Sequence, residues 1–298
     1  MNNDLNTPDA FIPAEIAKKV ENSGVKKAAM PLGSMFLLAV LAGVFVAFGA
    51  IFATAATAGS PVKDAAGMIS GYSNGMSYGL SRVVMGVTFC AGLILVVLAG
   101  AELFTGNNLM TIAFLSKKIS LIALLRNWLV VYLGNFVGSL LVAGLLFLSR
   151  EYTNGSGAMG YNALSIGAAK TSFEFLPAFF LAIFCNMLVC LAVWMCFGAR
   201  SVGDKILAII FPISAFVAAG FEHSVANMFF IPYALFVKDF AGTEFLSTLP
   251  TVKGIETLTW PNFFIGNLLP VTLGNILGGA FFIGVVYWLI YLRKRDQS

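Results

Sequence analysis

The chain has 298 residues, of which 59% are hydrophobic and only 11% are charged, and its mean hydropathy is +0.88. Soluble domains carry about a quarter charged residues, so this composition excludes an ordinary soluble protein and indicates a membrane protein with several spans. The apolar stretches are long and do not alternate, which excludes a transmembrane β-barrel and favours helices. The formal net charge is +4. The excess of lysine and arginine is explained by their enrichment on the cytoplasmic side of membrane proteins, so we expect no nucleic-acid partner.

The first thirty residues differ from the rest because charged residues surround a few apolar ones. Four lysines and four acidic residues flank Phe11, Ile16 and Val20, and Pro13 is well placed to start a helix. We therefore predict an amphipathic helix at the membrane surface within residues 1–30, on the side where it could plug a pore. A channel domain would follow over 31–293, with a short cytoplasmic tail at 294–298.

Six apolar blocks follow, each bounded by charged or Gly/Ser/Asn-rich connectors. They cover roughly 31–58, 80–115, 120–149, 171–199, 205–240 and 262–292. The second and fifth blocks are too long for one span, and polar residues interrupt them around Glu102 and Glu222. Non-helical backbone at membrane depth is tolerated only inside protein or beside a wet cavity. We therefore predict an all-α polytopic membrane protein with six transmembrane helices, of which the second and fifth are broken.

A repeat relates the two halves of the chain. The third block contains LGNFVG, residues 133–138, and the sixth contains LGNILG, residues 273–278. Glycine, glutamate and asparagine also recur at matching spacing in the second and fifth blocks. Because each half holds three spans, the second copy must be inverted in the membrane. Two inverted three-helix repeats are typical of transporters and channels, with the substrate site near the bilayer midplane. The glycines of the LGNxxG motifs are expected to allow close helix packing.

The distribution of lysine and arginine predicts the topology. With both termini in the cytoplasm, twelve of these residues fall on the inner side and six on the outer side. We therefore expect a multi-pass protein of the bacterial inner membrane with both termini cytoplasmic.

His223 is the one histidine of the chain and lies in the interrupted fifth block. Half-helix starts at such a break present unpaired N–H groups that favour an anion, which makes His223 a candidate pore residue rather than a structural one. The spacing of Thr105 leaves open whether its hydroxyl faces the pore or bonds back to its own helix. The four cysteines lack metal-ligand spacing, so we expect no disulfide, no metal and no cofactor.

The segments GAELFTGNNLM at 100–110 and GFEHSVANMF at 220–229 resemble the signature pair of the formate/nitrite transporter family. ARSVGDKI, HSVANMFFIP and the ending YWLIYLR are similar to bacterial formate channels in particular. The resemblance implies an aquaporin-like fold, a homopentamer with one pore per subunit, and transport of formate or a similar small monovalent anion across the lipid bilayer. It does not imply an enzyme.

The same resemblance implies roles for individual residues. His223 would be the central pore histidine, and the hydroxyl of Thr105 would meet it. Phe89 and Phe216 would form the outer hydrophobic constriction, and Leu93 the inner one. The remaining polar positions that match are support or vestibule residues: Glu222, Asn186, Asn275 and Lys170.

Several alternatives remain open at this stage. The Gly-Asn-Asn that follows Thr105 is associated with nitrite or hydrosulfide relatives as much as with formate channels. A neutral-solute channel of aquaporin type is less favoured, since the paired Asn-Pro-Ala motifs are missing. An intramembrane enzyme built on residues 222–224 is disfavoured because adjacent residues point in different directions. An imidazole titrates in the neutral range, so we expect pH-sensitive, bidirectional flux, either channel-like or proton-coupled.

Overall fold

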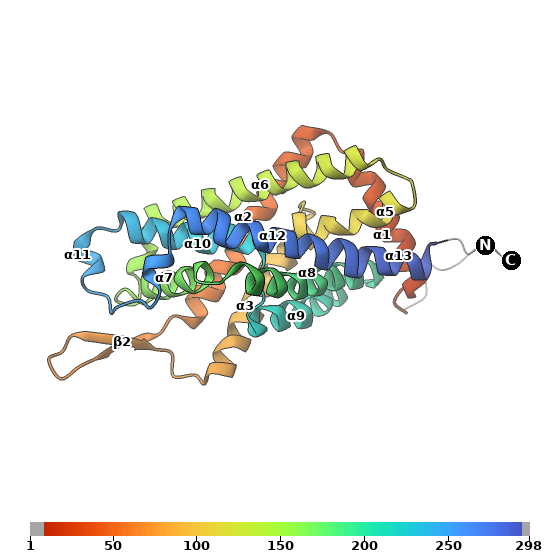
Figure 1. Ribbon diagram of the computed structural model, residues 1–298. Coiled ribbons are helices and arrows are strands. Elements are labelled where there is room, and N and C mark those ends of the chain that lie inside the picture. The colour runs from red at the N-terminus through yellow and green to blue at the C-terminus, as the bar shows by residue number, and fades with distance from the viewer. Residues whose placement is uncertain (1–8, 294–298) are drawn as a thin grey trace.

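The computed structural model describes residues 9–293 and places six long apolar segments side by side (Figure 1). Each is long and apolar enough to cross a bilayer. They are α2 (Leu32–Thr57), α3 (Tyr78–Ala99), α6 (Leu121–Leu148), α8 (Phe175–Gly198), α9 (Val202–Ala219) and the continuous segment Asn262–Tyr291. The last segment contains two π-helical stretches around α12 and ends in α13: η4 (Asn262–Leu268), α12 (Leu269–Ile276), η5 (Leu277–Val285) and α13 (Val286–Tyr291). The six predicted blocks are confirmed, with ends that shift by a few residues.

The second and fifth blocks are interrupted at their middles. The second block continues after α3 with short elements, which are α4 (Phe104–Asn107), η1 (Asn108–Met110) and α5 (Thr111–Leu115). The fifth block continues after α9 with α10 (Ser224–Phe240). Both first halves end on a glycine in the left-handed region, Gly100 at φ +80° and Gly220 at φ +77°. Such a C-cap stops a helix and turns the chain, so each break begins where the sequence provides that glycine.

Equivalent glycines bring the helices of each half close together. A Cβ on Gly138 would collide with the carbonyl of Val40 in α2, and a Cβ on Gly278 would collide with the carbonyl of Ile183 in α8. The expectation that the LGNxxG glycines permit close packing is therefore confirmed. The packing of α6 on α2 in the first half corresponds to that of α12 on α8 in the second.

Helix α1 (Pro13–Ala28) lies at the same end of the molecule as α13 (Figure 1). Pro13 begins it, as predicted, and its apolar face packs on the protein through Ile16 and Val20, against Leu109 and Trp194 among others. The first eight residues of the predicted N-terminal segment, and the predicted tail at 294–298, lie outside the described residues.

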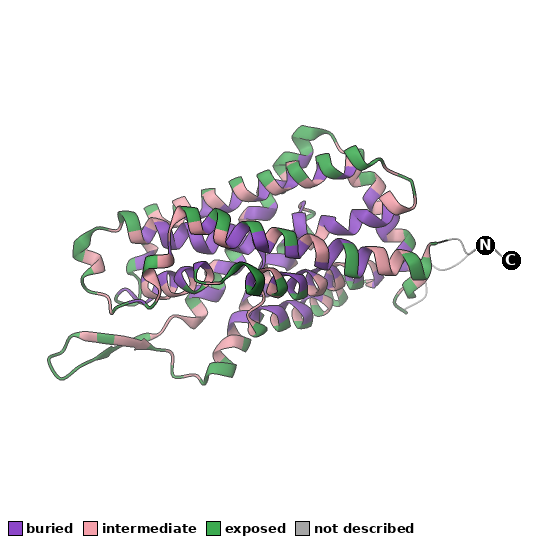
Figure 2. Ribbon diagram, viewed as in Figure 1, coloured by how far each residue is buried: buried purple, intermediate pink, exposed green. Residues whose placement is uncertain are grey.

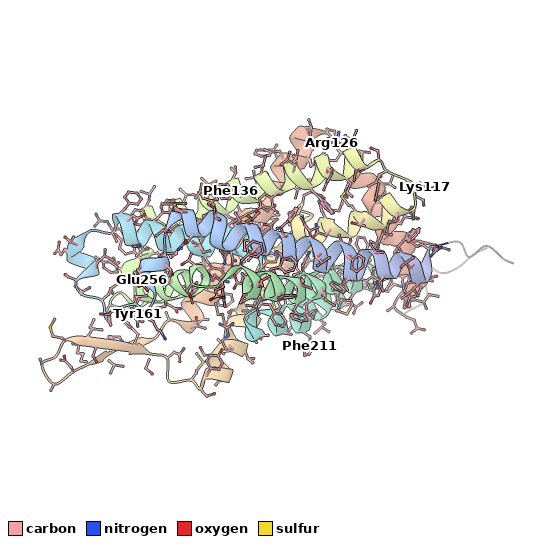
Figure 3. All side chains as sticks on the ribbon, in the orientation of Figure 1. Lys117, Arg126, Phe136, Tyr161, Phe211 and Glu256 are labelled. Carbon is pink, nitrogen blue, oxygen red and sulfur yellow. The ribbon has the colours of Figure 1, made fainter. Side chains whose placement is uncertain are left out.

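The opposite end carries elements that the sequence did not predict. They are a two-stranded antiparallel hairpin of β1 (Ser60–Lys63) and β2 (Ile69–Ser73), η2 (Glu151–Thr153), α7 (Ala158–Thr171), α11 (Thr243–Leu246) and η3 (Ile255–Thr257). Figure 3 shows Glu256 and Tyr161 toward this end, and Lys117 and Arg126 toward the other. Helix α7 is short and rich in small residues, which explains why hydropathy alone did not reveal it.

Many large apolar side chains are exposed on the outside of the bundle. Figure 2 shows the buried residues on the inner sides of the helices and the exposed ones on the outer sides. Leu37 and Phe211 on the outer faces are 65% and 77% exposed, and the polar side chains of Asn135 and Asn275 are fully buried. This arrangement inverts the usual pattern of a soluble protein and suits a protein whose surroundings are lipid or further subunits.

Candidate functional site

Two cavities approach each other through the interior, one from each end of the molecule. The hairpin-side cavity, of about 500 Å³, is lined by residues of α3, α7 and the break after α9, including Arg82, Lys170 and His223. The α1-side cavity, of about 260 Å³, is lined by residues of α1, α3, α8 and the break after α3. Phe89 lines the first cavity and Leu93, one turn later on α3, lines the second. The barrier between the cavities is therefore about one helical turn thick at this point.

His223 and Thr105 meet at this barrier. The Oγ1 of Thr105 lies 2.9 Å from Nε2 of His223, and both side chains are buried. The Nδ1 of His223 accepts the backbone N–H of Ala226 at 3.0 Å, so the imidazole also caps the N-terminus of α10. Because that N–H can only donate, Nδ1 carries no proton, and the neutral ring has its proton on Nε2 facing Thr105. The threonine therefore contacts the histidine rather than only its own helix.

Aromatic rings close the hairpin-side cavity around the histidine. The rings of Phe89 and Phe216 lie edge to face with centroids 5.8 Å apart, and Phe216 stacks on His223 at 5.9 Å. Phe230 stacks on Phe89 at 6.3 Å and lines the same cavity. Sequence reasoning missed Phe230. Helical spacing could have indicated it, because it lies one turn after Ala226 on the helix that His223 caps.

Asn275 holds the break that carries His223. Its Oδ1 accepts the backbone N–H of Ser224 at 2.9 Å, and its Nδ2 donates to the carbonyls of Glu222 and Ala182 at 3.0 and 2.8 Å. Non-helical backbone in a membrane needs such partners, because no water satisfies it there. Asn275 therefore supports the backbone of the break, and within residues 9–293 it makes no hydrogen bond to the imidazole.

Asn135 makes the equivalent bonds at the other break. Its Oδ1 accepts the N–H of Phe104 at 2.9 Å, and its Nδ2 donates to the carbonyls of Glu102 and Ala39 at 2.9 and 2.8 Å. Both asparagines are the third residue of an LGNxxG motif. The LGNxxG repeat therefore packs helices together and also places, beside each break, an asparagine that hydrogen-bonds its backbone.

A partly buried ion pair lies beside each break. In the second half, Nζ of Lys170 is 2.8 Å from Oε1 of Glu222, and the other carboxylate oxygen of Glu222 accepts from Asn227 and Asn267. Asn227 also donates to Asn267. Lys170 lies in the wall of the hairpin-side cavity, at the position where a vestibule lysine was expected.

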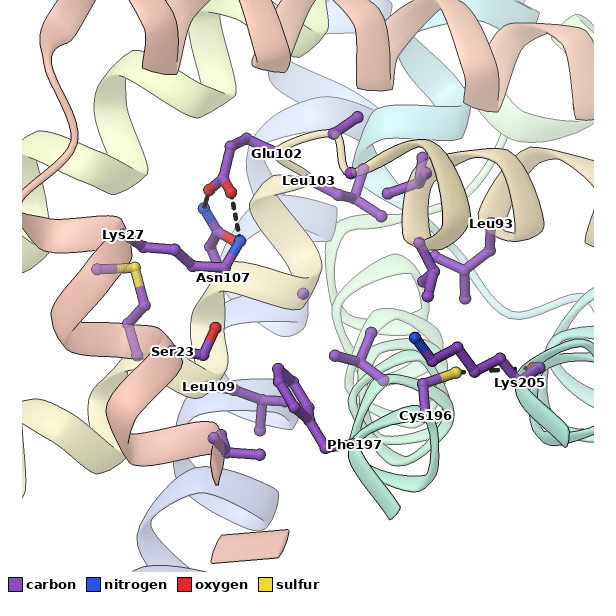
Figure 4. Close-up of a pocket in the computed structure, with 18 residues that line it drawn as sticks. Ser23, Lys27, Leu93, Glu102, Leu103, Asn107, Leu109, Cys196, Phe197 and Lys205 are labelled. Carbon is purple, nitrogen blue, oxygen red and sulfur yellow. Dashed lines mark hydrogen bonds and ion pairs between the residues drawn. The ribbon is translucent and has the colours of Figure 1, made fainter. Parts of the chain in front are cut away.

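The first half repeats this cluster. Nζ of Lys27 is 2.5 Å from Oε1 of Glu102, and Asn107 donates to Oε2 of Glu102 and to Asn127. Figure 4 shows Lys27, Glu102 and Asn107 together on one side of the α1-side cavity. Sequence reasoning missed Lys27 and Asn127. The spacing could have found Asn127, since it precedes Asn135 by eight residues as Asn267 precedes Asn275.

Asn186 lies between the two halves. Its Nδ2 donates to Oδ1 of Asn108 and to the carbonyl of Asn275, both at 2.7 Å. It therefore links the segment after one break to the helix that supports the other. It does not line either cavity.

Comparisons with known proteins agree with this architecture. Residues 14–289 match the family model described as formate/nitrite transporter. The formate channel FocA of Escherichia coli K12 is 41% identical over 290 residues, which cover 97% of both chains. A probable formate transporter of Methanothermobacter thermautotrophicus is 38% identical and covers 95% of this chain and 97% of its own. A solved structure described as a pentameric formate channel with formate bound has a TM-score of 0.76 at 40% identity, covering 88% of this chain and 98% of its own.

Proposed function

Because this chain belongs to the formate/nitrite transporter family, we propose that it is a bidirectional channel for formate and similar small monovalent anions, with His223 at the centre of its pore. The family consists of channels and transporters, so the chain is not an enzyme. Its six apolar helices and its relatives indicate a multi-pass protein of the bacterial inner membrane.

The observation that carries the proposal is the meeting of two cavities at the pair of His223 and Thr105. A carboxylate that enters this barrier loses water and needs hydrogen-bond donors in its place. The Nε2–H of His223 faces the Oγ1 of Thr105, so the threonine proton is free to donate to the anion. The Nε2–H becomes a second donor, from the opposite half of the protein, when the anion takes the place of Oγ1. The apolar rings of Phe89 and Phe216, and Leu93 on the other side, keep bulk water away.

The neutral imidazole explains how pH sensitivity would arise. A second proton would have to bind Nδ1, and the bond from the N–H of Ala226 would then be lost. An arriving anion favours the doubly protonated ring through its charge. The proton either returns to water, as in a channel, or leaves with the anion as a neutral acid. Flux that depends on pH is expected in both cases, because each involves a proton on the ring.

Formate is favoured over nitrite or hydrosulfide by the relatives, whose names describe formate channels or transporters. The described solved relative is pentameric, and the large apolar outer faces of this chain suit both lipid and neighbouring subunits, so we propose a homopentamer. The lysine and arginine bias supports cytoplasmic termini, which places the α1-side cavity inside and the hairpin-side cavity outside. Helix α1 would then line the inner entrance through Val20, Ser23 and Lys27.

The test is anion flux into liposomes that contain the purified protein, comparing formate, nitrite, hydrosulfide and lactate from pH 5 to 8. The proposal predicts that formate permeates fastest and that its rate changes with pH. If nitrite or hydrosulfide permeates faster than formate, the proposed pore still holds but the proposed substrate is wrong. The Gly-Asn-Asn after Thr105 would then be the better indicator of substrate.

A further inference from the structure

Charge attracts an anion to a pore only where it is not already balanced. In the hairpin-side cavity, two basic side chains and one acidic side chain line the wall: Arg82, Lys170 and Glu222. Lys170 and Glu222 form an ion pair at 2.8 Å, and the carboxylate has further donors in Asn227 and Asn267. The pair is close to neutral at a distance. The lysine can still donate a hydrogen bond to a passing anion, but the net charge of this cavity must come from elsewhere.

Arg82 provides that net charge. Its guanidinium donates to the carbonyls of Val217 and Ala218 at 2.5 and 3.1 Å, and no carboxylate of residues 9–293 lies within ion-pair distance of it. These carbonyls belong to the last turn of α9, whose negative end carries about half an elementary charge. One full positive charge against about half a negative one leaves the cavity wall positive. Arg82 is also partly exposed to the cavity, so an anion can reach it.

The α1-side cavity repeats this pattern with different residues. Its charged lining consists of Lys27, Glu102 and Lys205. Lys27 and Glu102 are paired at 2.5 Å, whereas the ammonium of Lys205 has no hydrogen bond or ion pair within the described part of the chain. The neighbouring carboxylate of Asp204 is occupied by the cap of α9, where it accepts from the backbone N–H groups of residues 200 and 201. Figure 4 shows Lys205 across the cavity from Lys27.

The two unbalanced cations occupy related places in the repeat. Arg82 lies in the second turn of α3 and Lys205 in the first turn of α9, and these are the two half-helices that lead into the breaks. Each cation lines the same cavity as a break with its Lys–Glu pair, and the guanidinium of Arg82 lies beside Gly220 at the break itself. An anion in either cavity would therefore meet a net positive charge together with balanced polar donors.

We propose that Arg82 and Lys205 are the anion-recruiting residues of the two vestibules, one for each direction of entry. The inference rests on the proposed anion-channel function and adds residues to it. Recruitment by a focused charge raises the entry rate, and the effect falls as salt screens the charge.

The experiment compares two matched double variants in liposomes. Arg82→Gln with Lys205→Gln removes both cavity cations, and Lys63→Gln with Lys117→Gln removes two exposed cations at the two ends of the protein, outside both cavities. The initial rate of formate entry is measured well below saturation, at ~0.02 M and at ~0.5 M salt. Using both positions together makes the result independent of the orientation of the protein in the liposome.

The proposal predicts that the cavity double variant slows entry about fivefold at low salt and approaches the wild-type rate at high salt. The control double variant should keep the wild-type rate at both salt concentrations. Equal slowing in both double variants would show a general surface-charge effect and overturn the proposal. An unchanged rate in the cavity variant would also overturn it.

Two further measurements keep the test decisive. Arg82→Lys keeps the positive charge and loses the planar guanidinium, so it should retain most of the formate entry rate at low salt. This variant is used if Arg82→Gln does not fold. Each single variant is then measured in right-side-out and inside-out membrane vesicles, where Arg82→Gln should slow entry from one side and Lys205→Gln from the other. The wild-type rate tests the proposed function itself. If the wild-type protein passes no anion, both the proposed function and this inference fail. If the wild-type protein passes formate and only the slowing of the cavity double variant is missing, this inference alone fails.

Discussion

Asn275 gives the sharpest prediction about how the break at His223 is held. Replacing it with alanine removes one acceptor and two donors, which now satisfy Ser224 N–H and the carbonyls of Glu222 and Ala182. Each such bond contributes about 1 kcal/mol, and these groups would remain buried without partners. We therefore expect a loss of about 3 kcal/mol, which corresponds to a midpoint of thermal unfolding lower by roughly 6–12 °C.

The assay is thermal unfolding of the detergent-solubilised protein, followed by size-exclusion elution after heating. Asn135→Ala should cause a similar shift, because it removes the equivalent three bonds at the other break. Asn262→Ala is the control: it removes one bond, to the carbonyl of Thr257, from a partly buried side chain, and should shift the midpoint much less. Asn275→Asp should be no better than alanine, since a carboxylate cannot donate to two carbonyls. An unchanged midpoint in Asn275→Ala would refute the assigned role.

Other predictions follow from helix packing and from the ion pair of Lys170 and Glu222. Gly278→Ala should destabilise the protein by about 1–3 kcal/mol, because its Cβ would overlap the carbonyl of Ile183. Gly266→Ala is the control and should cost little, because the nearest neighbouring atom is 3.7 Å from the added Cβ. Equal midpoints of thermal unfolding for the two variants would contradict this prediction. Glu222→Gln should destabilise by about 1.5–3 kcal/mol because it leaves the partly buried ammonium of Lys170 without its carboxylate. Adding Lys170→Met should restore part of that loss, and a double variant less stable than Glu222→Gln would argue against the pairing.

The six spans and the two interruptions could be predicted because the bilayer sets the length of an apolar helix and penalises unpaired backbone. Polar residues around Glu102 and Glu222 therefore indicated both breaks, and the structure shows that each begins at a left-handed glycine, Gly100 or Gly220. The contact between Thr105 and His223 came from the family resemblance, since spacing left the threonine free to bond to its own helix. The structure brings the two side chains together from opposite halves.

Other parts of the site depend on tertiary contacts that no local pattern shows. Lys27 reaches Glu102 across 75 residues, and it lies in a helix that the sequence placed only at the membrane surface. Arg82 lies near the start of the second apolar block, and no local pattern shows that its guanidinium binds the end of α9. The hairpin is held through Tyr72, whose hydroxyl donates to the carbonyl of Ser156 and whose ring contacts the ring of Tyr161. The sequence of the hairpin is polar and does not indicate where it packs.

The most direct test of the central claim is formate flux through His223→Asn in liposomes. Asparagine can still cap α10 in place of Nδ1, so the helix should keep its start, while the donor that faces Thr105 is lost. We predict that the variant elutes like the wild-type protein and that its formate flux falls to the rate of empty liposomes. Wild-type flux from a correctly folded His223→Asn variant would contradict the proposal that this histidine is the centre of the pore.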